Sequence, residues 1–324
     1  MRLVTFSHNH PPRTGAMHGD HVVDLGRAFG AMLAATGDDC VSDPLVDALV
    51  PGDTVELLRG GHRSLAAARD ALDWAAAQAE QAESLRTRWD EPILVPLADV
   101  QLGPPVRHPR KVIGVGLNYR DHAEEQGAKI PRNPILFAKF DRGLIGHGQP
   151  IEHPDTTQKL DYEAELAVVI GRHARDLEPE EVDEHIAGYT AFNDVTARDI
   201  QFADRQWLRG KVGDTHAPIG PWLVTRDELP DPSDLGIRLR HNGDVLQDST
   251  TAQLIFDVPT IVSFVSRTVT LEPGDVIATG TPGGVGFARD PEIYLREGDV
   301  VSVEIDGIGT LENPVVAASS RPHR

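Results

Sequence analysis

The sequence predicts an α+β protein in which a small N-terminal α+β domain precedes a larger, mostly β domain built as a sandwich or roll with peripheral helices. Three observations predict this fold class. A chain of 324 residues with 40% hydrophobic and 25% charged residues is long enough for about two domains with their own cores. A proline-rich stretch at 90–111 lacks sustained periodicity. Many short strand-like runs follow it, without the strand–helix alternation of a doubly wound sheet.

The first 105 residues form the predicted N-terminal domain. Two short strands are expected at 2–6 and 21–25, around a turn rich in proline and glycine. A weak helical pattern follows at 26–35. A clear one runs over 62–84, where Ala and Leu recur at helical spacing among charged residues. The proline-rich stretch after it is predicted to be a linker or a crossover that joins the domains.

The predicted second domain spans residues 106–318, and residues 319–324 form a polar tail. Strands are expected at 112–116, 135–139, 163–170, 188–193, 222–225, 237–241, 275–279 and 300–305. Turn signals separate them, among them Asn242-Gly243, a dipeptide typical of two-residue hairpins. Helices are expected at 119–126, 178–186, 195–207 and 258–267.

The charge and the cysteine content limit the classes of partner and site. Asp plus Glu number 50 against 31 Lys plus Arg, and the formal net charge of −19 opposes nonspecific binding to nucleic acid or to an anionic membrane. The N-terminal segment has no apolar signal-peptide core, and no apolar run approaches about 18 residues. We therefore expect a cytoplasmic protein. Cys40 is the single cysteine, which excludes an intrachain disulfide and a zinc site built on several thiolates.

A run of alternating carboxylates is the most informative feature of the chain. Asp161, Glu163 and Glu165 are spaced so that in one continuous strand all three side chains point to the same side. Such repulsion needs a counter-charge, and Mg²⁺, Mn²⁺ and Ca²⁺ prefer carboxylate oxygens. An acidic strand face in water is the alternative. Asp194, at the end of the later strand 188–193, can cap the following helix or serve as a third ligand.

Other polar residues could act beside such a cation. Arg198 and Gln201 share one face of the predicted helix and could hold a substrate carboxylate or carbonyl, although an ordinary helix surface has the same pattern. His122 and Glu125 could form a dyad in which the carboxylate orients the imidazole for general-base catalysis. An exposed ion pair would look identical. Lys211 lies between glycines, where it could reach over a bound substrate or be a mobile surface lysine.

Five of these segments, taken in order, resemble the fumarylacetoacetate hydrolase family, specifically its bacterial two-domain members of the acylpyruvase and 2-hydroxyhepta-2,4-diene-1,7-dioate isomerase type. The segments are 115–122, 134–139, 161–165, 193–199 and 274–286, and the likeness extends from about residue 107 to residue 315. The resemblance implies a mixed β-sandwich roll, a homodimer, and one Mg²⁺ or Mn²⁺ ion, with Ca²⁺ as a further candidate.

The resemblance also implies a set of site residues. The metal ligands would be Glu163, Glu165 and Asp194, the catalytic residues His122, Glu125 and Lys211, and the substrate-binding residues Arg198, Gln201 and Thr281. It does not make Asp161 a ligand. One departure concerns the lysine loop, which in the family often reads Lys-Ser-Phe-Asp-Thr and here reads Lys211-Val-Gly-Asp-Thr215. The change bears on pocket shape and substrate preference.

The activity expected first is metal-dependent hydrolysis of a C–C bond in a β-diketo acid of the acylpyruvate type, giving pyruvate and a carboxylic acid. His122 would activate the attacking water, and Lys211 with Gln201 would stabilise the oxyanion. The same chemistry supports three alternatives: decarboxylation of oxaloacetate, its keto–enol tautomerisation, or isomerisation of a hydroxymuconate-type diacid. Outside enzymes, the alternative is a catalytically silent metal-binding protein. The expected substrate in each catalytic case is a small oxo acid.

Overall fold

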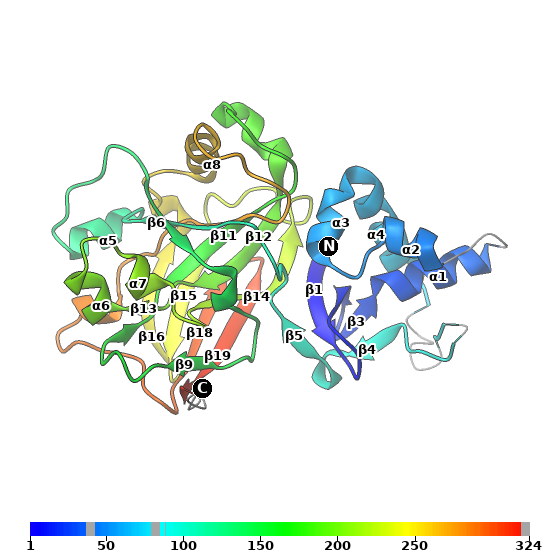
Figure 1. The fold of residues 1–324 in the computed structure, drawn as a ribbon, viewed down its shortest axis with the longest axis horizontal. Helices are drawn as coiled ribbons and strands as arrows, with labels where there is room; N and C mark the ends of the chain where they lie inside the picture. Colours follow the sequence, from blue (N-terminus) through cyan, green and yellow to red (C-terminus); the bar gives the residue numbers. More distant parts are fainter. Residues whose placement is uncertain (37–42, 79–84, 88, 319–324) are drawn as a thin grey trace, which may run out of the picture.

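The computed structural model describes residues 1–36, 43–78, 85–87 and 89–318. Cys40, the end of the helix predicted to reach residue 84, and the tail at 319–324 lie outside these residues. The chain forms two lobes side by side (Figure 1). The N-terminal lobe contains β1 to β5 and α1 to α4, and the large lobe contains the elements that follow. The boundary near residue 105 stays a prediction.

A 12-stranded sheet runs through both lobes. Its main path has the order β4-β3-β2-β1-β14-β12-β11-β17-β6-β7. Its strands are β1 (Arg2–Ser7), β2 (Arg13–His18), β3 (His21–Asp24), β4 (Leu94–Pro96), β5 (Gln101–Gly103), β6 (Val112–Gly116), β7 (Ile135–Lys139), β8 (Leu144–Ile145), β11 (Ala164–Ile170), β12 (Ile186–Asn193), β14 (Ala217–Thr225) and β17 (Val276–Ala278). The lobes join where β1 pairs antiparallel with β14, Arg2 lying opposite Val224. The proline-rich stretch supplies β4 and β5 to this sheet.

Four helices cover the N-terminal strands: α1 (Leu25–Ala35), α2 (Asp43–Leu49), α3 (Thr54–Arg59) and α4 (Gly61–Ala76). Asp24 caps α1 by accepting a hydrogen bond from the Arg27 N–H at 3.0 Å, and Asp53 caps α3 in the same way. The predicted helix at 62–84 is α4. Its buried alanines include Ala67, Ala71 and Ala75, whose spacing places them on one face of the helix.

A five-stranded sheet in the order β16-β15-β18-β19-β9 forms the second layer of the large lobe. Its strands are β9 (Ile151–His153), β15 (Gly236–His241), β16 (Asp244–Thr250), β18 (Val300–Ile305) and β19 (Gly309–Ala317). The predicted turn joins β15 to β16, and Asn242 and Gly243 both have the positive φ that such a hairpin turn requires, 53° and 91°.

Strand β11 is buried on both faces, which explains its nearly continuous apolar sequence. Leu166 and Val168 belong to the core between the two sheets, together with residues of β15 and β18. The alternate residue Val169 belongs to a second core that includes Val55 and Leu57 of α3. The sheet-rich α+β fold predicted from the sequence is therefore confirmed, with one sheet shared between the lobes.

The remaining helices are short and peripheral. They are α5 (Arg120–Glu125), α6 (Arg198–Ala203), α7 (Leu208–Lys211) and α8 (Val258–Ser266), and α5, α6 and α7 lie together at the end of the large lobe that is remote from the N-terminal lobe (Figure 1). The helix predicted at 195–207 is confirmed only over 198–203, which form α6. Thr196 and Ala197 form a short strand instead, and α7 begins only at Leu208. The helix predicted at 178–186 is a 3₁₀ segment, Pro179–His185.

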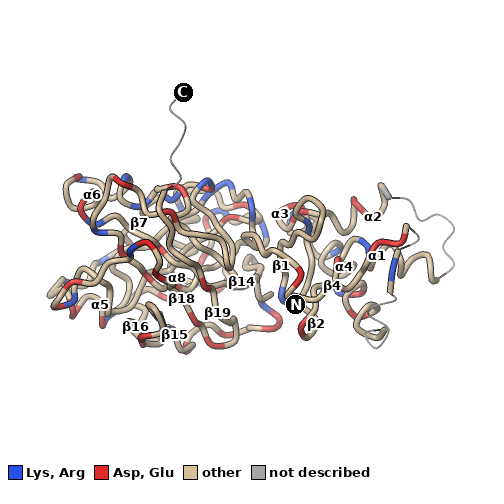
Figure 2. Tube along the Cα trace, turned by 90° about the horizontal axis from the view of Figure 1, so that it is seen from below, with Lys and Arg blue, Asp and Glu red and all other residues tan. Residues whose placement is uncertain are grey.

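Charged residues are distributed over both lobes, with acidic residues (red in Figure 2) interspersed with basic ones (blue). Within the described part of the chain, every helix is too short or too polar to cross a bilayer. The cytoplasmic location expected from the sequence stays a prediction.

Candidate active site

Three buried carboxylates meet where β11 begins and β12 ends. The two strands are antiparallel, and Ala164 lies opposite Asn193, so the residues that flank this pair come together. Each of Glu163, Glu165 and Asp194 offers a carboxylate oxygen, and these oxygens lie within 4.8 Å of one another. The structure therefore brings together the three residues that the sequence suggested as ligands. A group of carboxylate oxygens with this spacing suits a hard divalent cation.

Asp161 does not join this group, so the expectation that all three acids of the run share one strand face is wrong. The strand is interrupted, because β10 (Leu160–Asp161) ends before β11 begins at Ala164. The Asp161 carboxylate instead accepts from Arg198 Nε at 2.8 Å and from the N–H groups of Gly286 and Phe287 at 2.8 and 3.1 Å. Glycine is required at position 286, since a Cβ there would lie 1.9 Å from the carbonyl oxygen of Ile293.

Three buried cations neutralise the acids. Lys211 Nζ donates to Glu163 Oε2 at 2.8 Å and to Asp194 Oδ2 at 2.7 Å, so Lys211 is not a mobile surface lysine. Arg198 Nη2 donates to Glu163 Oε1 at 2.6 Å. Lys139, at the end of β7, binds Asp194 Oδ1 and the carbonyl oxygen of Val195, the latter at 3.3 Å. Lys139 was not among the predicted site residues. Its only sequence signal is a lysine that ends an otherwise apolar strand.

The surroundings shift the pKa values of Glu163 and Glu165 in opposite directions. Burial alone would raise the pKa of Glu163, but the Lys211 ammonium and the Arg198 guanidinium lower that pKa to about 2. Burial raises the pKa of Glu165 well above its ordinary value, and the negative charges of Asp194 and Glu163 raise it further. Glu163 is therefore ionised, and a positive charge that enters the site would favour the ionised form of Glu165.

His122 on α5 is held between two polar side chains. Its Nδ1 lies 3.3 Å from Glu125 Oε2, and its Nε2 lies 2.6 Å from the side-chain nitrogen of Gln126. Glu125 is fixed in turn, since its Oε1 accepts from the N–H of Gly284 at 2.8 Å. This pattern fits the tautomer in which Nδ1–H donates to Glu125 and Nε2 keeps its lone pair. The sequence pattern predicted the His122–Glu125 pair but not Gln126.

A cavity of about 150 Å³ joins these groups. Its polar lining consists of His122, Gln126, Glu163, Glu165, Arg198, Gln201, Lys211 and Thr281, and its apolar lining of Val115, Leu117, Ile135, Phe137, Phe202, Trp207 and Phe287. Thr281 Oγ1 accepts from Gln247 Nε2 at 2.9 Å, and Arg198 Nη1 donates to Gln201 Oε1 at 3.0 Å. Gln247 and the aromatic lining were not predicted, because neither forms a local sequence pattern with the polar residues.

The departure in the lysine loop affects packing behind the site. Neither Val212 nor Gly213 is among the residues that line the cavity. A Cβ at position 213 would lie 2.2 Å from Nδ1 of His216, so the glycine makes room for this buried imidazole. Burial, together with the nearby Lys139 ammonium, lowers the pKa of His216 to about 4. His216 is therefore neutral.

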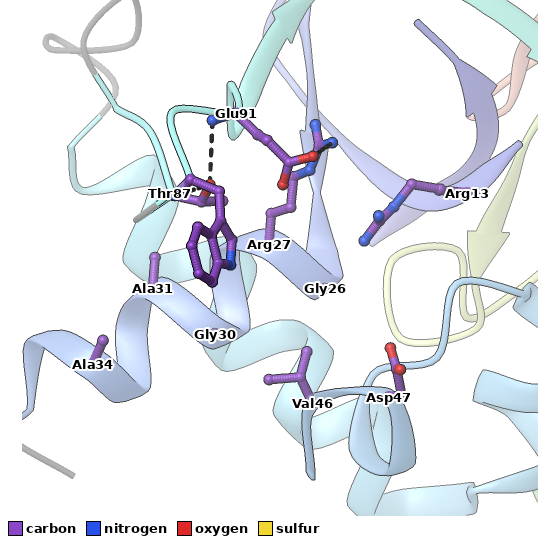
Figure 3. Close-up of a pocket in the computed structure, with 11 residues that line it drawn as sticks. Arg13, Gly26, Arg27, Gly30, Ala31, Ala34, Val46, Asp47, Thr87 and Glu91 are labelled. Carbon is purple, nitrogen blue, oxygen red and sulfur yellow. Dashed lines mark hydrogen bonds and ion pairs between the residues drawn. The ribbon is translucent and has the colours of Figure 1, made fainter. Parts of the chain in front are cut away.

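A separate cavity of about 300 Å³ lies in the N-terminal lobe (Figure 3). Its arginines are already paired, Arg27 with Glu91 at 2.7 Å and Arg13 with Asp24 at 3.0 Å. The floor is formed by small residues of α1, among them Gly30. In the described residues, the group of His, Cys, Asp and Glu side chains that could hold a metal lies in the large lobe.

Comparisons with known proteins show the family of the chain. The family profile described as Fumarylacetoacetate (FAA) hydrolase C-terminal matches residues 111–316. The mitochondrial oxaloacetate tautomerase of Xenopus laevis is 38% identical over 98% of this chain and 90% of its own. The solved fumarylacetoacetate hydrolase of Exiguobacterium antarcticum is 37% identical with a TM-score of 0.76, over 98% of this chain and 99% of its own. The solved 5-carboxymethyl-2-hydroxymuconate delta-isomerase of Mycobacterium smegmatis is 34% identical with a TM-score of 0.71, over 99% of this chain and 100% of its own. The chain therefore belongs to the fumarylacetoacetate hydrolase family.

Proposed function

We propose that the protein is a divalent-metal-dependent enzyme that moves a proton on a small 2-oxo acid, and that it interconverts the enol and keto forms of oxaloacetate. The observation that carries this proposal is a single small cavity lined by an oriented histidine and by two of the three clustered carboxylates. The similarity to an oxaloacetate tautomerase over 98% of the chain supports tautomerisation better than the C–C hydrolysis that we expected first.

The residues present fit a divalent cation. Glu163, Glu165 and Asp194 would hold it, since they offer three clustered oxygens in a buried site. Bound there, Mg²⁺ or Mn²⁺, or Ca²⁺, would supply a Lewis acid that stabilises the negative charge developing on a 2-oxo oxygen. The paired lysines and arginine already show that this position favours positive charge.

His122 is the proposed proton carrier. With Nδ1–H directed to Glu125, the lone pair of Nε2 can take the proton of the enol hydroxyl and deliver a proton to C3. Gln126 now donates to that nitrogen and has to turn aside when substrate binds. The Arg198 guanidinium and the Thr281 hydroxyl line the cavity, where they would bind the substrate carboxylates.

The size of the cavity favours a short acid. About 150 Å³ is a volume that elsewhere accommodates a molecule as small as benzene. Tautomerisation needs one proton carrier and no attacking water, so a compact cavity suffices. Isomerisation of a hydroxymuconate-type diacid uses the same residues, and the similarity to the Mycobacterium smegmatis isomerase makes it the second candidate.

The test follows loss of enol absorbance of oxaloacetate with purified protein and Mg²⁺, together with assays for pyruvate and CO₂. Acceleration of enol loss without pyruvate or CO₂ is the expected result. An acylpyruvate and a carboxymethyl hydroxymuconate are run in parallel. Cleavage of the acylpyruvate, or isomerisation of the muconate without action on oxaloacetate, would replace the proposal. The predicted homodimer is tested by light scattering of the same preparation.

A further inference from the structure

We propose that the two buried lysines of the site have different tasks: Lys211 occupies the cation position and leaves it when a divalent cation binds, whereas Lys139 stays in place and positions Asp194. The inference rests on the metal part of the proposed function and is independent of the substrate.

The carboxylate oxygens of Glu163 and Asp194 are already bound by cations. Lys211 Nζ bridges Glu163 Oε2 and Asp194 Oδ2, and thus lies between two of the three proposed metal ligands. The other oxygen of Glu163 accepts from Arg198, and the other oxygen of Asp194 binds Lys139. A divalent cation between the same carboxylates needs the two oxygens that Lys211 bridges. Since an ammonium and a divalent cation repel each other strongly at such short range, both cannot hold these oxygens.

Lys139 is anchored where no such competition arises. It contacts Asp194 through Oδ1, the oxygen turned away from Lys211, and it also donates to the carbonyl oxygen of Val195. Its backbone lies in β7, where it pairs with Val112 of β6. Lys139 can therefore remain on Asp194 while the opposite oxygen exchanges one cation for another, and its removal would free the carboxylate to rotate.

Lys211 has a place to which its ammonium can move. It ends the four-residue helix α7, and Val212 and Gly213 follow it. Its ammonium lies 5.0 Å from the ring centroid of Phe137, which lines the cavity. The face of an aromatic ring stabilises a nearby cation, so a short movement away from the acids leaves the ammonium over Phe137 and inside the cavity. In this position the Lys211 ammonium would contact the substrate only after the metal has bound. The metal would therefore bind before the substrate.

The direct test is calorimetric titration of Mn²⁺ into metal-free wild-type protein and three variants. Lys211→Met is expected to bind Mn²⁺ at least roughly tenfold more tightly, because the internal competitor is gone. Lys139→Met is expected to bind it at least roughly tenfold more weakly. Lys159→Met is the matched control with unchanged affinity, since Lys159 forms an exposed pair with Glu292 at 2.9 Å. Equal or weaker binding by Lys211→Met would overturn the exchange, and unchanged binding by Lys139→Met would overturn its positioning role.

A second measurement uses the wild-type protein and does not depend on the folding of a variant. Lys211 and Lys139 are both nearly inaccessible, with exposed fractions of 2% and 4%. Reductive methylation followed by mass spectrometry should label Lys211 faster when Mn²⁺ is present and leave Lys139 unlabelled. Labelling of Lys211 that does not respond to Mn²⁺ would overturn the exchange. If the wild-type protein binds no Mn²⁺, the metal site in the proposed function is wrong. If it binds Mn²⁺ but Lys211 stays in place, only the further inference is wrong and the proposed function stands.

Discussion

The Asp161→Asn variant tests how a buried ion pair positions Arg198. The Asp161 carboxylate has an exposed fraction of 0%, binds Arg198 Nε at 2.8 Å and accepts from three backbone N–H groups. The amide removes the charge and turns a donor toward groups that are donors themselves. Removing one partner of a buried ion pair costs about 3 to 5 kcal/mol, and Arg198 would keep only Glu163 as a charged partner. The unfolding entropy of a chain of 324 residues is about 0.7 kcal/mol/K, so Tm should fall by about 4 to 7 °C.

Asp248→Asn is the matched control, measured with Asp161→Asn by scanning calorimetry at near-neutral pH. Asp248 binds Arg238 Nε at 3.0 Å, but the two side chains are 63% and 35% exposed. An exposed pair contributes about 0.2 to 1 kcal/mol, which corresponds to a fall in Tm of less than about 2 °C. Asp161→Asn should also raise KM for the oxo acid, because Arg198 loses its fixed orientation. Equal falls in Tm for the two variants would refute the reasoning.

Chelation of divalent cations with EDTA is expected to abolish activity, and Mg²⁺ or Mn²⁺ to restore it; full activity after chelation would contradict the metal assignment. His122→Gln should lower kcat by about 10² to 10⁴ in the enol-absorbance assay while Tm stays close to that of the wild type, and an unchanged kcat would exclude His122 as the proton carrier. Because burial lowers the pKa of His216 from its ordinary 6.5 to about 4, the unfolded chain takes up this proton first as the pH falls. The stability that the neutral imidazole contributes is complete above pH 6.5 and decreases by about 3 kcal/mol as the pH falls to about 4. Urea denaturation should show a smaller loss of unfolding free energy over this pH range for His216→Gln than for the wild type. An equal loss would contradict the conclusion that His216 is buried in its neutral form.

The sequence predicted strands well where apolar runs contain no proline, as in β6, β7 and β11. Among the strands that it missed are β2 and β16, together with the first part of β14 and all of β19, and the last two contain Pro218, Pro221 and Pro314. Proline lacks the N–H that a sheet requires, so its presence argues against a strand. In β14 the pairing with β12 shifts register, because Tyr189 lies opposite Val224 whereas Ala191 lies opposite Gly220. Such an irregularity is not visible in the sequence.

Some residues of the candidate site could be predicted from a local sequence pattern, and others could not. Glu163 and Glu165 could be identified because their alternation is local, and His122 with Glu125 because they lie one helical turn apart. The position of Asp161 could not be predicted, because the break between β10 and β11 interrupts the alternation of side chains. Lys139 gave no usable pattern, because its partner Asp194 lies 55 residues away in the sequence and meets it only through the sheet.

The claim that His122 moves a proton on oxaloacetate in this cavity is tested most directly by deuterium uptake at C3. Enol oxaloacetate is ketonised in D₂O with Mg²⁺, and the product is analysed by NMR with wild-type protein, with His122→Gln and with buffer alone. The wild type should place a single deuterium on one face of C3 faster than buffer does, and His122→Gln should match buffer. Uptake by the wild type at the rate of buffer, or stereospecific uptake by His122→Gln at the wild-type rate, would contradict the claim.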